Sequence, residues 1–332
     1  MTPPNPPTLY LIDGYAAIFR AFFAIRRPLY SPVTGEPTQA ILVFAQMLLK
    51  LYATHAPDYV VVAWDAPGRT FRDDLYARYA LAGPGDTVTS EPAPPWADPP
   101  SEADTTLPDT PTPTAPQYKG TRRATPDSLG QQVPRILEIL GQFGIPVIGK
   151  PGLEADDVIA TITDRVLRDP THPDIRVRIV SRDKDLEQLL GERVTLFDVH
   201  TDEETDEAAL WTRRGVTPAQ VVDFLTLTGD AVDNIPGVAG IGSRTAAKLL
   251  QQYGSLEGVL ENLPQIKGFW RENLEQARPT LPISQRLIAL ERDPEILFDL
   301  ETARARPVPA SELASLFETL GFARMREQML RF

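Results

Sequence analysis

Short apolar segments alternate with longer stretches of helical periodicity over the first two thirds of the chain. The short segments are rich in β-branched residues and predict strands at residues 9–12, 59–64, 177–180 and 194–197. Helices are expected at 39–52, at 127–143 and after Pro151, where apolar residues recur at helical spacing from Ala155 to Val166. This alternation predicts an α/β fold with a mostly parallel central sheet flanked by helices.

No convincing strand pattern follows residue 216. The remaining segments predict helices at 218–227, 246–253, 256–262 and 311–320, joined by short turns. We therefore expect two regions, an α/β core over residues 1–215 and a helical region over 216–332 that packs on it.

One stretch interrupts the pattern of the α/β region. Residues 82–117 hold ten of the 33 prolines and six acids, without any Lys or Arg. A segment of this composition cannot bury an apolar core, so we predict a disordered acidic insertion.

Acidic residues stand where the predicted strands end. Asp13 and Asp65 follow the first two strands, and Asp183 with Asp185 follows the third. The carboxyl ends of parallel strands meet at one edge of a sheet, and that edge is where such sheets bind ligands. Five further acids fall in loops or at helix starts from which they could reach the same edge: Glu154, Asp156, Asp157, Asp230 and Asp233.

Each acid alone has an ordinary structural explanation, because acids are common in strand-to-helix loops and in the first turn of a helix. Nine carboxylates at one edge are different, since they would repel one another and raise one another's pKa values. Divalent cations would relieve this repulsion, and carboxylates without Cys or His favour Mg²⁺ or Mn²⁺. The number of acids suffices for two ions, an arrangement suited to phosphoryl chemistry.

Composition narrows the chemistry further. The chain has no cysteine and three histidines, which excludes disulfides, thiol nucleophiles and Cys-based zinc sites. The net charge of −12 argues at first against a nucleic-acid ligand, but six of the acids lie in the insertion, and two bound divalent ions would offset four more. Neither a signal peptide nor an apolar run of membrane length is recognisable, so we expect a cytoplasmic protein without a membrane partner.

A glycine-rich segment near residue 240 is a candidate for phosphate contact. Its spacing fits neither a dinucleotide-binding loop nor a Walker-type loop. Residues 234–254 hold two basic residues and no acid within an acidic chain. We therefore favour a hairpin between helices whose backbone N–H groups meet phosphate over a plain helix connector. The candidate residues are Gly237, Gly240, Gly242, Ser243, Arg244 and Lys248.

Five segments, in this order, resemble the motifs of one nuclease family: LIDGYAAIFRAFFAI, VVAWDAPGRTFR, GLEADDVIA, SRDKDLEQLL and TGDAVDNIPGVAGIGSRTAAKLL. The chain resembles the 5′ nuclease domain of bacterial DNA polymerase I, in a stand-alone form, and the wider flap endonuclease family. The resemblance runs from about residue 9 to residue 332 apart from the insertion, and it fills all nine acidic positions. It implies the PIN-like fold of these nucleases.

The resemblance also implies cofactors and their ligands. It implies two Mg²⁺ ions, with Mn²⁺ as an alternative, and a helix-hairpin-helix at about 234–254 that grips duplex DNA and in the family often holds K⁺. The first metal site would comprise Asp13, Asp65, Glu154 and Asp156. The second would comprise Asp183, Asp185, Asp230 and Asp233, with Asp157 between the two sites.

Basic and aromatic residues are carried over in the same way. Arg20 corresponds to a family arginine near the scissile phosphate. Residues 118–122 look like the family's arch motif, in which Lys119 and Arg122 would steer that phosphate. Arg72 and Tyr118 belong to the same motifs and are expected to contact DNA.

The insertion separates Arg72 from Tyr118, whereas the corresponding motifs are nearly continuous in the family. We hypothesise that its six acids weaken non-productive DNA binding by mimicking phosphate charge. The alternative is a tolerated surface loop without a role.

We therefore predict a metal-dependent hydrolase: a structure-specific 5′ nuclease with 5′→3′ exonuclease and 5′-flap endonuclease activity, acting by two-metal catalysis in DNA replication and repair. Two alternatives stay open, a PIN-like RNase and a catalytically inactive protein that binds branched DNA. The expected partners are DNA with 5′ flaps, nicks or 5′ ends and RNA primers on DNA, with a functional link to a DNA polymerase and a ligase. We expect a monomer associated with the nucleoid.

Overall fold

The computed structural model describes residues 6–81, 118–120, 125–293 and 295–330. The predicted acidic insertion at 82–117 lies outside these residues. The chain divides into two compact units. The first unit draws on Met1–Gly68, Ala124–Arg213 and Leu290–Phe332, and the second on Arg69–Arg123 and Arg214–Ala289.

The first unit is built on a six-stranded sheet in the order β3-β2-β1-β4-β5-β6. Its strands pair in parallel, except that β5 and β6 are antiparallel. Central β1 pairs with β2 on one side and with β4 on the other. The structure confirms the mostly parallel sheet predicted from the sequence. The strands are β1 Thr8–Asp13, β2 Tyr59–Ala63, β3 Val147–Ile148, β4 Arg176–Val180, β5 Val194–Asp198 and β6 Glu203–Thr205.

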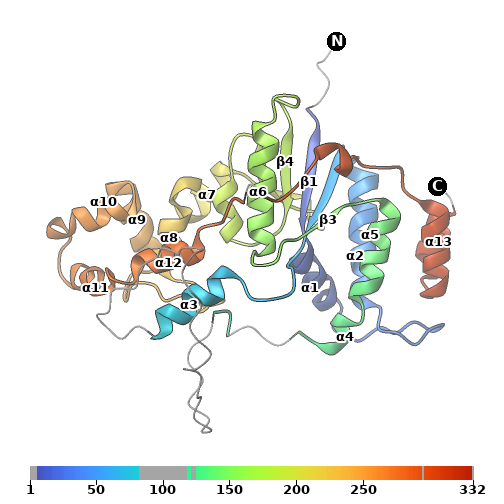
Figure 1. Cartoon of the computed structure of the whole chain (residues 1–332), viewed down its shortest axis with the longest axis horizontal. Helices are drawn as coiled ribbons and strands as arrows, with labels where there is room; N and C mark the ends of the chain where they lie inside the picture. The colour runs from blue at the N-terminus through green and yellow to red at the C-terminus, as the bar shows by residue number, and fades with distance from the viewer. Residues whose placement is uncertain (1–5, 82–117, 121–124, 294, 331–332) are drawn as a thin grey trace, which may run out of the picture. The chain divides into compact units, whose positions relative to one another are not determined.

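Helices cover both faces of this sheet (Figure 1). All five residues of β2 are buried, as a strand covered on both faces requires. Tyr10 and Ile12 of β1 face a core shared with α1, α2, α5 and α13, while Leu9 and Leu11 point to the other face, where α6 packs. The helices are α1 Gly14–Ala24, α2 Gln39–Lys50, α4 Asp127–Gly130, α5 Val133–Phe143, α6 Ala155–Arg168, α7 Glu207–Arg214, α13 Ala310–Thr319 and α14 Ala323–Met329.

The single helix predicted at 127–143 is two helices in the structure. The first, α4, ends at Gly130, and α5 begins at Val133 with Pro134 in its first turn, where proline is tolerated. Between them the buried Gln132 side chain accepts the backbone N–H of Ala40 at 2.7 Å. The break therefore fastens the start of α5 to the start of α2.

The C-terminal stretch belongs to the sheet unit rather than to the helical region in which the sequence analysis placed it. Residues Leu313 and Phe317 of α13 and Met325 of α14 are buried in the same apolar core as Tyr10 and Ile12. Before α13 the returning chain follows α6, where the Asp293 N–H donates to Thr161 Oγ1 at 2.9 Å. A helical periodicity identifies the buried face of α13, but not the surface that covers it.

The second unit is helical, as predicted for the segments that follow residue 216. Within its described residues no strand of a sheet occurs. Its core includes Phe224, Leu250, Leu274 and Leu287. Among all described helices of the chain, none is both long and apolar enough to cross a bilayer. The helices are α3 Phe71–Leu81, α8 Val221–Thr228, α9 Ser243–Tyr253, α10 Leu256–Glu261, α11 Phe269–Ala277 and α12 Leu281–Ile288.

Replacing Phe317 by Ala should lower the free energy of unfolding by about 3–5 kcal/mol, because it removes a fully buried aromatic ring from the core of the first unit. The Leu297 side chain is 90% exposed, so Leu297→Ala should change this free energy by less than about 0.5 kcal/mol. Urea unfolding of both variants measures the difference. Equal stabilities would contradict the placement of residues 290–332 in the core.

Candidate active site

The first unit gathers acids at the carboxyl edge of its sheet. Asp13 is the last residue of β1, Asp65 lies two residues beyond β2, and Asp183 lies three residues beyond β4. From β1 the sheet extends to one side through β2 and β3 and to the other side through β4, β5 and β6. The strand order therefore switches direction at β1. Open parallel sheets bind ligands at this switch in strand order.

Asp13 is buried and doubly held. Its Oδ1 accepts the N–H of Ala16 at 3.1 Å, which caps α1, and its Oδ2 accepts the hydroxyl of Ser181 at 3.1 Å. The pKa of Asp13 is raised to about 7; burial is the main cause, and the charges of Asp65 and Asp183 add to it against the lowering effect of these hydrogen bonds. Asp13 therefore lies within electrostatic reach of two other predicted ligands.

The start of α6 adds Glu154 and Asp156 to this edge. Glu154 is the N-cap of α6, and the next backbone N–H, that of Ala155, donates to Asp65 Oδ1 at 2.8 Å. Burial raises the pKa of Asp156 well above its ordinary value, and the charges of Asp13 and Asp183 add to the effect. The structure thus brings the four acids predicted for the first metal site to one edge of one unit.

Asp157 also holds the start of α6 in place. It is completely buried, and its two carboxylate oxygens accept the backbone N–H groups of Glu154 at 3.0 Å and Glu291 at 2.8 Å. The first bond completes a capping box at the start of α6, and the second fastens the returning chain. Each oxygen of Asp157 thus accepts one backbone N–H, as each oxygen of Asp13 accepts one donor, and a place of Asp157 between the two metal sites stays a prediction.

A tight turn presents Asp183 and Asp185 after β4. The N–H of Asp183 donates to Ser181 Oγ at 3.1 Å, and the N–H of Asp185 donates to Asp183 Oδ1 at 2.9 Å. Lys184 lies between them, with its Nζ 3.8 Å from Asp185 Oδ1. Since Ser181 also bonds Asp13, one hydroxyl ties the turn to the end of β1.

In the second unit a second turn brings Asp230 and Asp233 together. The backbones of Asp230 and Ile235 exchange two hydrogen bonds of 2.8 Å each, and Asn234 adopts a left-handed conformation with φ of 63°. The turn leaves one carboxylate oxygen of Asp230 and one of Asp233 within 4.8 Å of each other. Two oxygens at this separation could share a hard cation.

The donor set fits the cation predicted from the sequence. All candidate ligands are carboxylates, and burial together with neighbouring negative charge raises the pKa values of Asp13 and Asp156. Hard divalent cations such as Mg²⁺ prefer carboxylate oxygens.

The arch residues are only partly described. Arg122 lies outside the described residues. The N–H of Lys119 donates to the carbonyl of Asp233 at 3.2 Å, so this residue lies beside the acidic turn of the second unit. Tyr118 is buried, with its ring 6.0 Å from that of Tyr76, which leaves little of it to meet DNA directly.

The prediction that Arg72 contacts DNA is wrong. Its side chain is 2% exposed, and its guanidinium donates to the carbonyls of Leu287 at 2.8 Å and Ala289 at 2.9 Å. Arg72 therefore satisfies the last carbonyl groups around α12 and joins α3 to it. The motif located the residue correctly but could not show the direction of its side chain.

The glycine-rich segment forms the connection between α8 and α9. Gly229 and Gly237 approach so closely that a Cβ on Gly237 would lie 2.4 Å from the Gly229 nitrogen. Helix α9 begins at Ser243 with Gly242 as its N-cap, three residues before the start predicted at residue 246. Gly242 offers no side-chain cap, and Ser243, Arg244 and Lys248 are exposed. This helix start can therefore offer backbone N–H groups and two cations to phosphate.

Arg20 reaches the acidic edge from α1. Its guanidinium donates to both oxygens of Asp198, at 2.8 Å each. Asp198 ends β5, and Arg182 also pairs with it. Asp198 and Arg182 were not predicted as site residues, because no local pattern marks the pair that Arg20 and Asp198 form across 178 residues.

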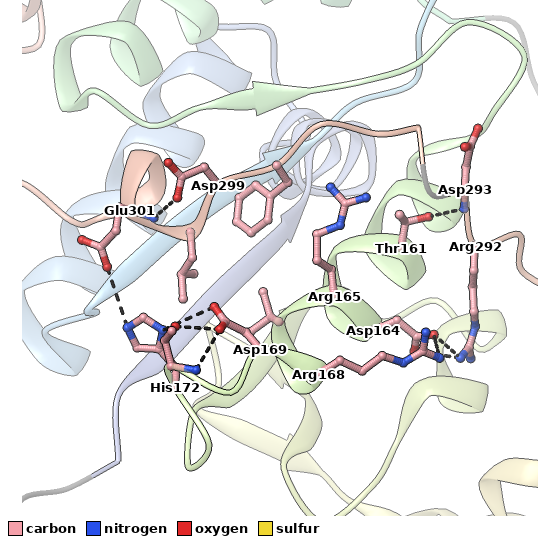
Figure 2. A pocket seen from close by; sticks show the side chains of 14 residues that line it. Thr161, Asp164, Arg165, Arg168, Asp169, His172, Arg292, Asp293, Asp299 and Glu301 are labelled. Carbon is pink, nitrogen blue, oxygen red and sulfur yellow. Dashed lines mark hydrogen bonds and ion pairs between the residues drawn. The ribbon is translucent and has the colours of Figure 1, made fainter.

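A cavity of about 670 Å³ lies beside the second half of α6, beyond the acidic edge (Figure 2). None of the predicted site residues lines it. Arg292 donates to both oxygens of Asp164 at 2.7 Å, and Arg168 reaches the same carboxylate at 3.1 Å. These two arginines of the cavity thus already pair with an acid of α6.

The raised pKa of Asp13 predicts how metal-free stability depends on pH. The folded state holds this proton up to about pH 7 but the unfolded state releases it near its ordinary value of 3.8, so metal-free stability should fall as pH rises between these values. Asp13→Asn should therefore raise Tm by several degrees in EDTA at pH 8 and by less at pH 4. Thermal unfolding measures this.

Asp174→Asn is the matched control, because Asp174 is exposed and in the same unit. It should leave Tm unchanged at both pH values. Mg²⁺ should raise the Tm of the wild type at pH 8 more than that of Asp13→Asn. A lower Tm for Asp13→Asn than for the wild type in EDTA at pH 8 would contradict electrostatic crowding at this edge.

The chain matches two family descriptions. Residues 8–82 and 106–215 match the 5′-3′ exonuclease, N-terminal resolvase-like domain, and residues 216–311 match the 5′-3′ exonuclease, C-terminal SAM fold. A 5′-3′ exonuclease of Aquifex aeolicus (strain VF5) is 33% identical over 313 residues, which are 94% of this chain and 92% of that protein. DNA polymerase I of Bacillus caldotenax is 33% identical over 327 residues, which are 97% of this chain. The chain spans 32% of the polymerase's length.

Solved structures show the same fold. T5 5′-exonuclease with bound divalent zinc ions gives a TM-score of 0.59 at 19% identity, with 98% of each chain covered. The catalytic core of Rad2 in complex with DNA substrate gives 0.59 at 13% identity, covering 98% of this chain and 92% of that one. Flap endonuclease-1 from Methanococcus jannaschii gives 0.53 at 14% identity, covering 98% and 91%. The sheet with its acidic edge, the family matches and the near full-length relative establish that this chain belongs to the 5′-3′ exonuclease family.

Proposed function

We propose that the chain is a structure-specific 5′ nuclease that hydrolyses DNA phosphodiesters at 5′ ends and 5′ flaps. The observation that carries the proposal is the group of acids at the carboxyl edge of the first unit, where the pKa values of Asp13 and Asp156 are raised by burial and by neighbouring charge. Membership of the 5′-3′ exonuclease family supports the inference that catalysis takes place at this edge. Family membership makes the enzyme a hydrolase that acts on DNA 5′ ends.

Divalent cations, with Mg²⁺ as the first candidate and Mn²⁺ as the second, complete the proposal. In the first unit they would be held by six acids, with Asp157 between the two ions: Asp13, Asp65, Glu154, Asp156, Asp183 and Asp185. In the second unit Asp230 and Asp233 offer two further oxygens. When bound, such ions lower the pKa of water and neutralise charge on the phosphate.

The chain's own residues would orient the ligands and the substrate. The N–H of Ala16 and the Ser181 hydroxyl fix the carboxylate of Asp13, and the N–H of Ala155 fixes that of Asp65. Such outer contacts keep acidic ligands in one orientation. Arg20, Lys119 and Arg122 are proposed to hold the scissile phosphate and to stabilise the charge that develops on it.

The α8–α9 hairpin of the second unit is proposed to bind the DNA duplex. Its glycines allow a close approach of backbone to phosphate, and Arg244 and Lys248 are exposed at positions i and i+4 on one face of α9. K⁺ bound by carbonyl groups of the hairpin would strengthen this contact. The hairpin favours a DNA substrate over the RNA substrate of a PIN-like RNase.

The partners follow from this function. DNA with 5′ flaps, nicks or 5′ ends, and RNA primers annealed to DNA, are the proposed substrates. A polymerase that creates flaps and a ligase that seals nicks are the proposed functional partners. We propose that the chain acts as a monomer.

Asp183→Ala should reduce kcat on 5′-flap DNA by at least about 100-fold in Mg²⁺, because it removes one carboxylate from the acidic edge. The assay compares 5′-flap DNA, single-stranded DNA and RNA, each with Mg²⁺ and with EDTA. Asp174→Ala, an exposed acid of the same unit, should retain full activity. Cleavage in EDTA, or full activity of Asp183→Ala, would refute metal-dependent catalysis, and preferred cleavage of RNA would favour the RNase.

Lys248→Ala should weaken binding of duplex DNA in EDTA and reduce the slope of log affinity against log salt by about 0.9, the contribution of one phosphate contact. Fluorescence anisotropy across a series of salt concentrations measures the slope. Lys267→Ala is the control, because Lys267 is an exposed lysine of the same unit beyond the hairpin. Equal slopes for Lys248→Ala and the wild type would contradict a phosphate contact by Lys248 of α9.

A further inference from the structure

Arg20 shares its acidic partner with a second arginine. Arg20 donates one nitrogen to each oxygen of Asp198, at 2.8 Å, and Arg182 donates to Oδ2 of the same carboxylate. The backbone N–H of His200 donates to Oδ1 at 2.9 Å. One carboxylate at the end of β5 thus fixes two guanidinium groups, one from α1 and one from the turn after β4.

The group carries excess positive charge that faces solvent. The Asp198 side chain is 5% exposed, whereas those of Arg20 and Arg182 are 36% and 57% exposed. Burial alone would raise the pKa of Asp198, but the hydrogen bonds of Arg20 and His200 hold it well below its ordinary value, so the carboxylate is ionised. Two guanidinium groups and one carboxylate leave one net positive charge. Glu203 lies 4.0 Å from Arg182 and offsets part of this charge, but it is 78% exposed, so the pair is weak.

The group lies at the same edge of the sheet as the predicted metal ligands. Arg182 directly precedes Asp183, and Arg20 lies two helical turns beyond Asp13 on α1. Because β5 runs parallel to β4, its final residue Asp198 ends at this edge. A cavity of about 270 Å³ adjoins the group, and its lining includes Arg20, Arg182, Asp183, His200, Met47 and Phe197.

We propose that Asp198 is a positioning residue that holds Arg20 and Arg182 together as a subsite that spans the scissile phosphate of DNA and the phosphodiester next to it. This inference rests on the proposed nuclease function. A guanidinium fixed by a carboxylate on one side keeps N–H donors for phosphate oxygens on the other, and loses little side-chain freedom when it binds them. The apolar part of the cavity, with Met47 and Phe197, offers room for the sugar or base attached to that phosphate.

The alternative is a purely structural ion pair, and the chain contains a matched example. Asp164 of α6 also accepts two arginines, Arg292 at 2.7 Å and Arg168 at 3.1 Å (Figure 2). It lies eight residues beyond Asp156, or about 12 Å along the helix. Substitutions there test the loss of a two-arginine pair away from the acidic edge.

The first experiment measures binding without catalysis. Anisotropy of labelled 5′-flap DNA in EDTA is followed across a series of salt concentrations for Arg182→Gln and for Arg168→Gln, both exposed arginines of the first unit. Arg182→Gln should reduce the slope of log affinity against log salt by about 0.7–0.9, and Arg168→Gln should leave it unchanged. An unchanged slope for Arg182→Gln overturns the proposal.

The second experiment separates positioning from charge. If Asp198 acted through its charge alone, its removal would tighten DNA binding. If it positions the two arginines, Asp198→Asn should lower kcat on flap DNA about tenfold or more and change KM by a smaller factor. Asp198→Asn combined with Arg182→Gln should lower kcat by less than the product of the single effects, since both act on one subsite. Asp164→Asn should retain the wild-type kcat.

The Tm of Asp198→Asn and of Asp164→Asn shows whether each variant is folded. If Asp198→Asn does not fold, the salt slope of Arg182→Gln tests the subsite on its own. A folded Asp198→Asn with the wild-type kcat overturns the positioning role. Failure of the wild type to cut flap DNA in Mg²⁺ would instead refute the proposed nuclease function. Wild-type cleavage together with unaffected variants refutes the subsite alone.

Discussion

Electrostatic repulsion among carboxylates at one edge of a parallel sheet is the constraint on which the rest of the first unit depends. Asp13 and Asp156 are held where burial and neighbouring charge raise their pKa values. The chain stabilises such acids with the backbone N–H groups at the starts of helices: Asp13 caps α1, and Asp65 accepts an N–H at the start of α6. These bonds offset part of the repulsion between the carboxylates. Bound cations would offset the rest.

Much of the fold could be predicted because its signals are local. The strands β1, β2, β4 and β5 are apolar runs with most of their residues buried, and α6 shows its buried face at helical spacing. The strands β3 and β6 have two and three residues, too few to show a period. The placement of α13 against the sheet was beyond reach, since amphipathicity indicates that a face is buried but not what buries it.

In the candidate site, too, the positions of residues could be predicted from the sequence, but the directions and partners of their side chains could not. Acids that follow strands could be located from the sequence, because parallel strands bring their carboxyl ends to one edge. Side-chain direction could not be predicted: Asp157 turns to two backbone N–H groups and Arg72 to two carbonyls, although both lie within recognisable motifs. Asp198 was missed altogether, because its two arginines come from other elements and only the folded chain brings them together.

The returning chain after α12 has a consequence for the length of a working fragment. Glu291 and Asp293 bond to Asp157 and Thr161 of α6 through their backbone N–H groups. A fragment that ended at residue 289 would keep all nine acids, yet it would expose one oxygen of a fully buried carboxylate and uncover the apolar core beneath α13. A fragment can therefore contain every candidate ligand and still be too short to hold those ligands in place.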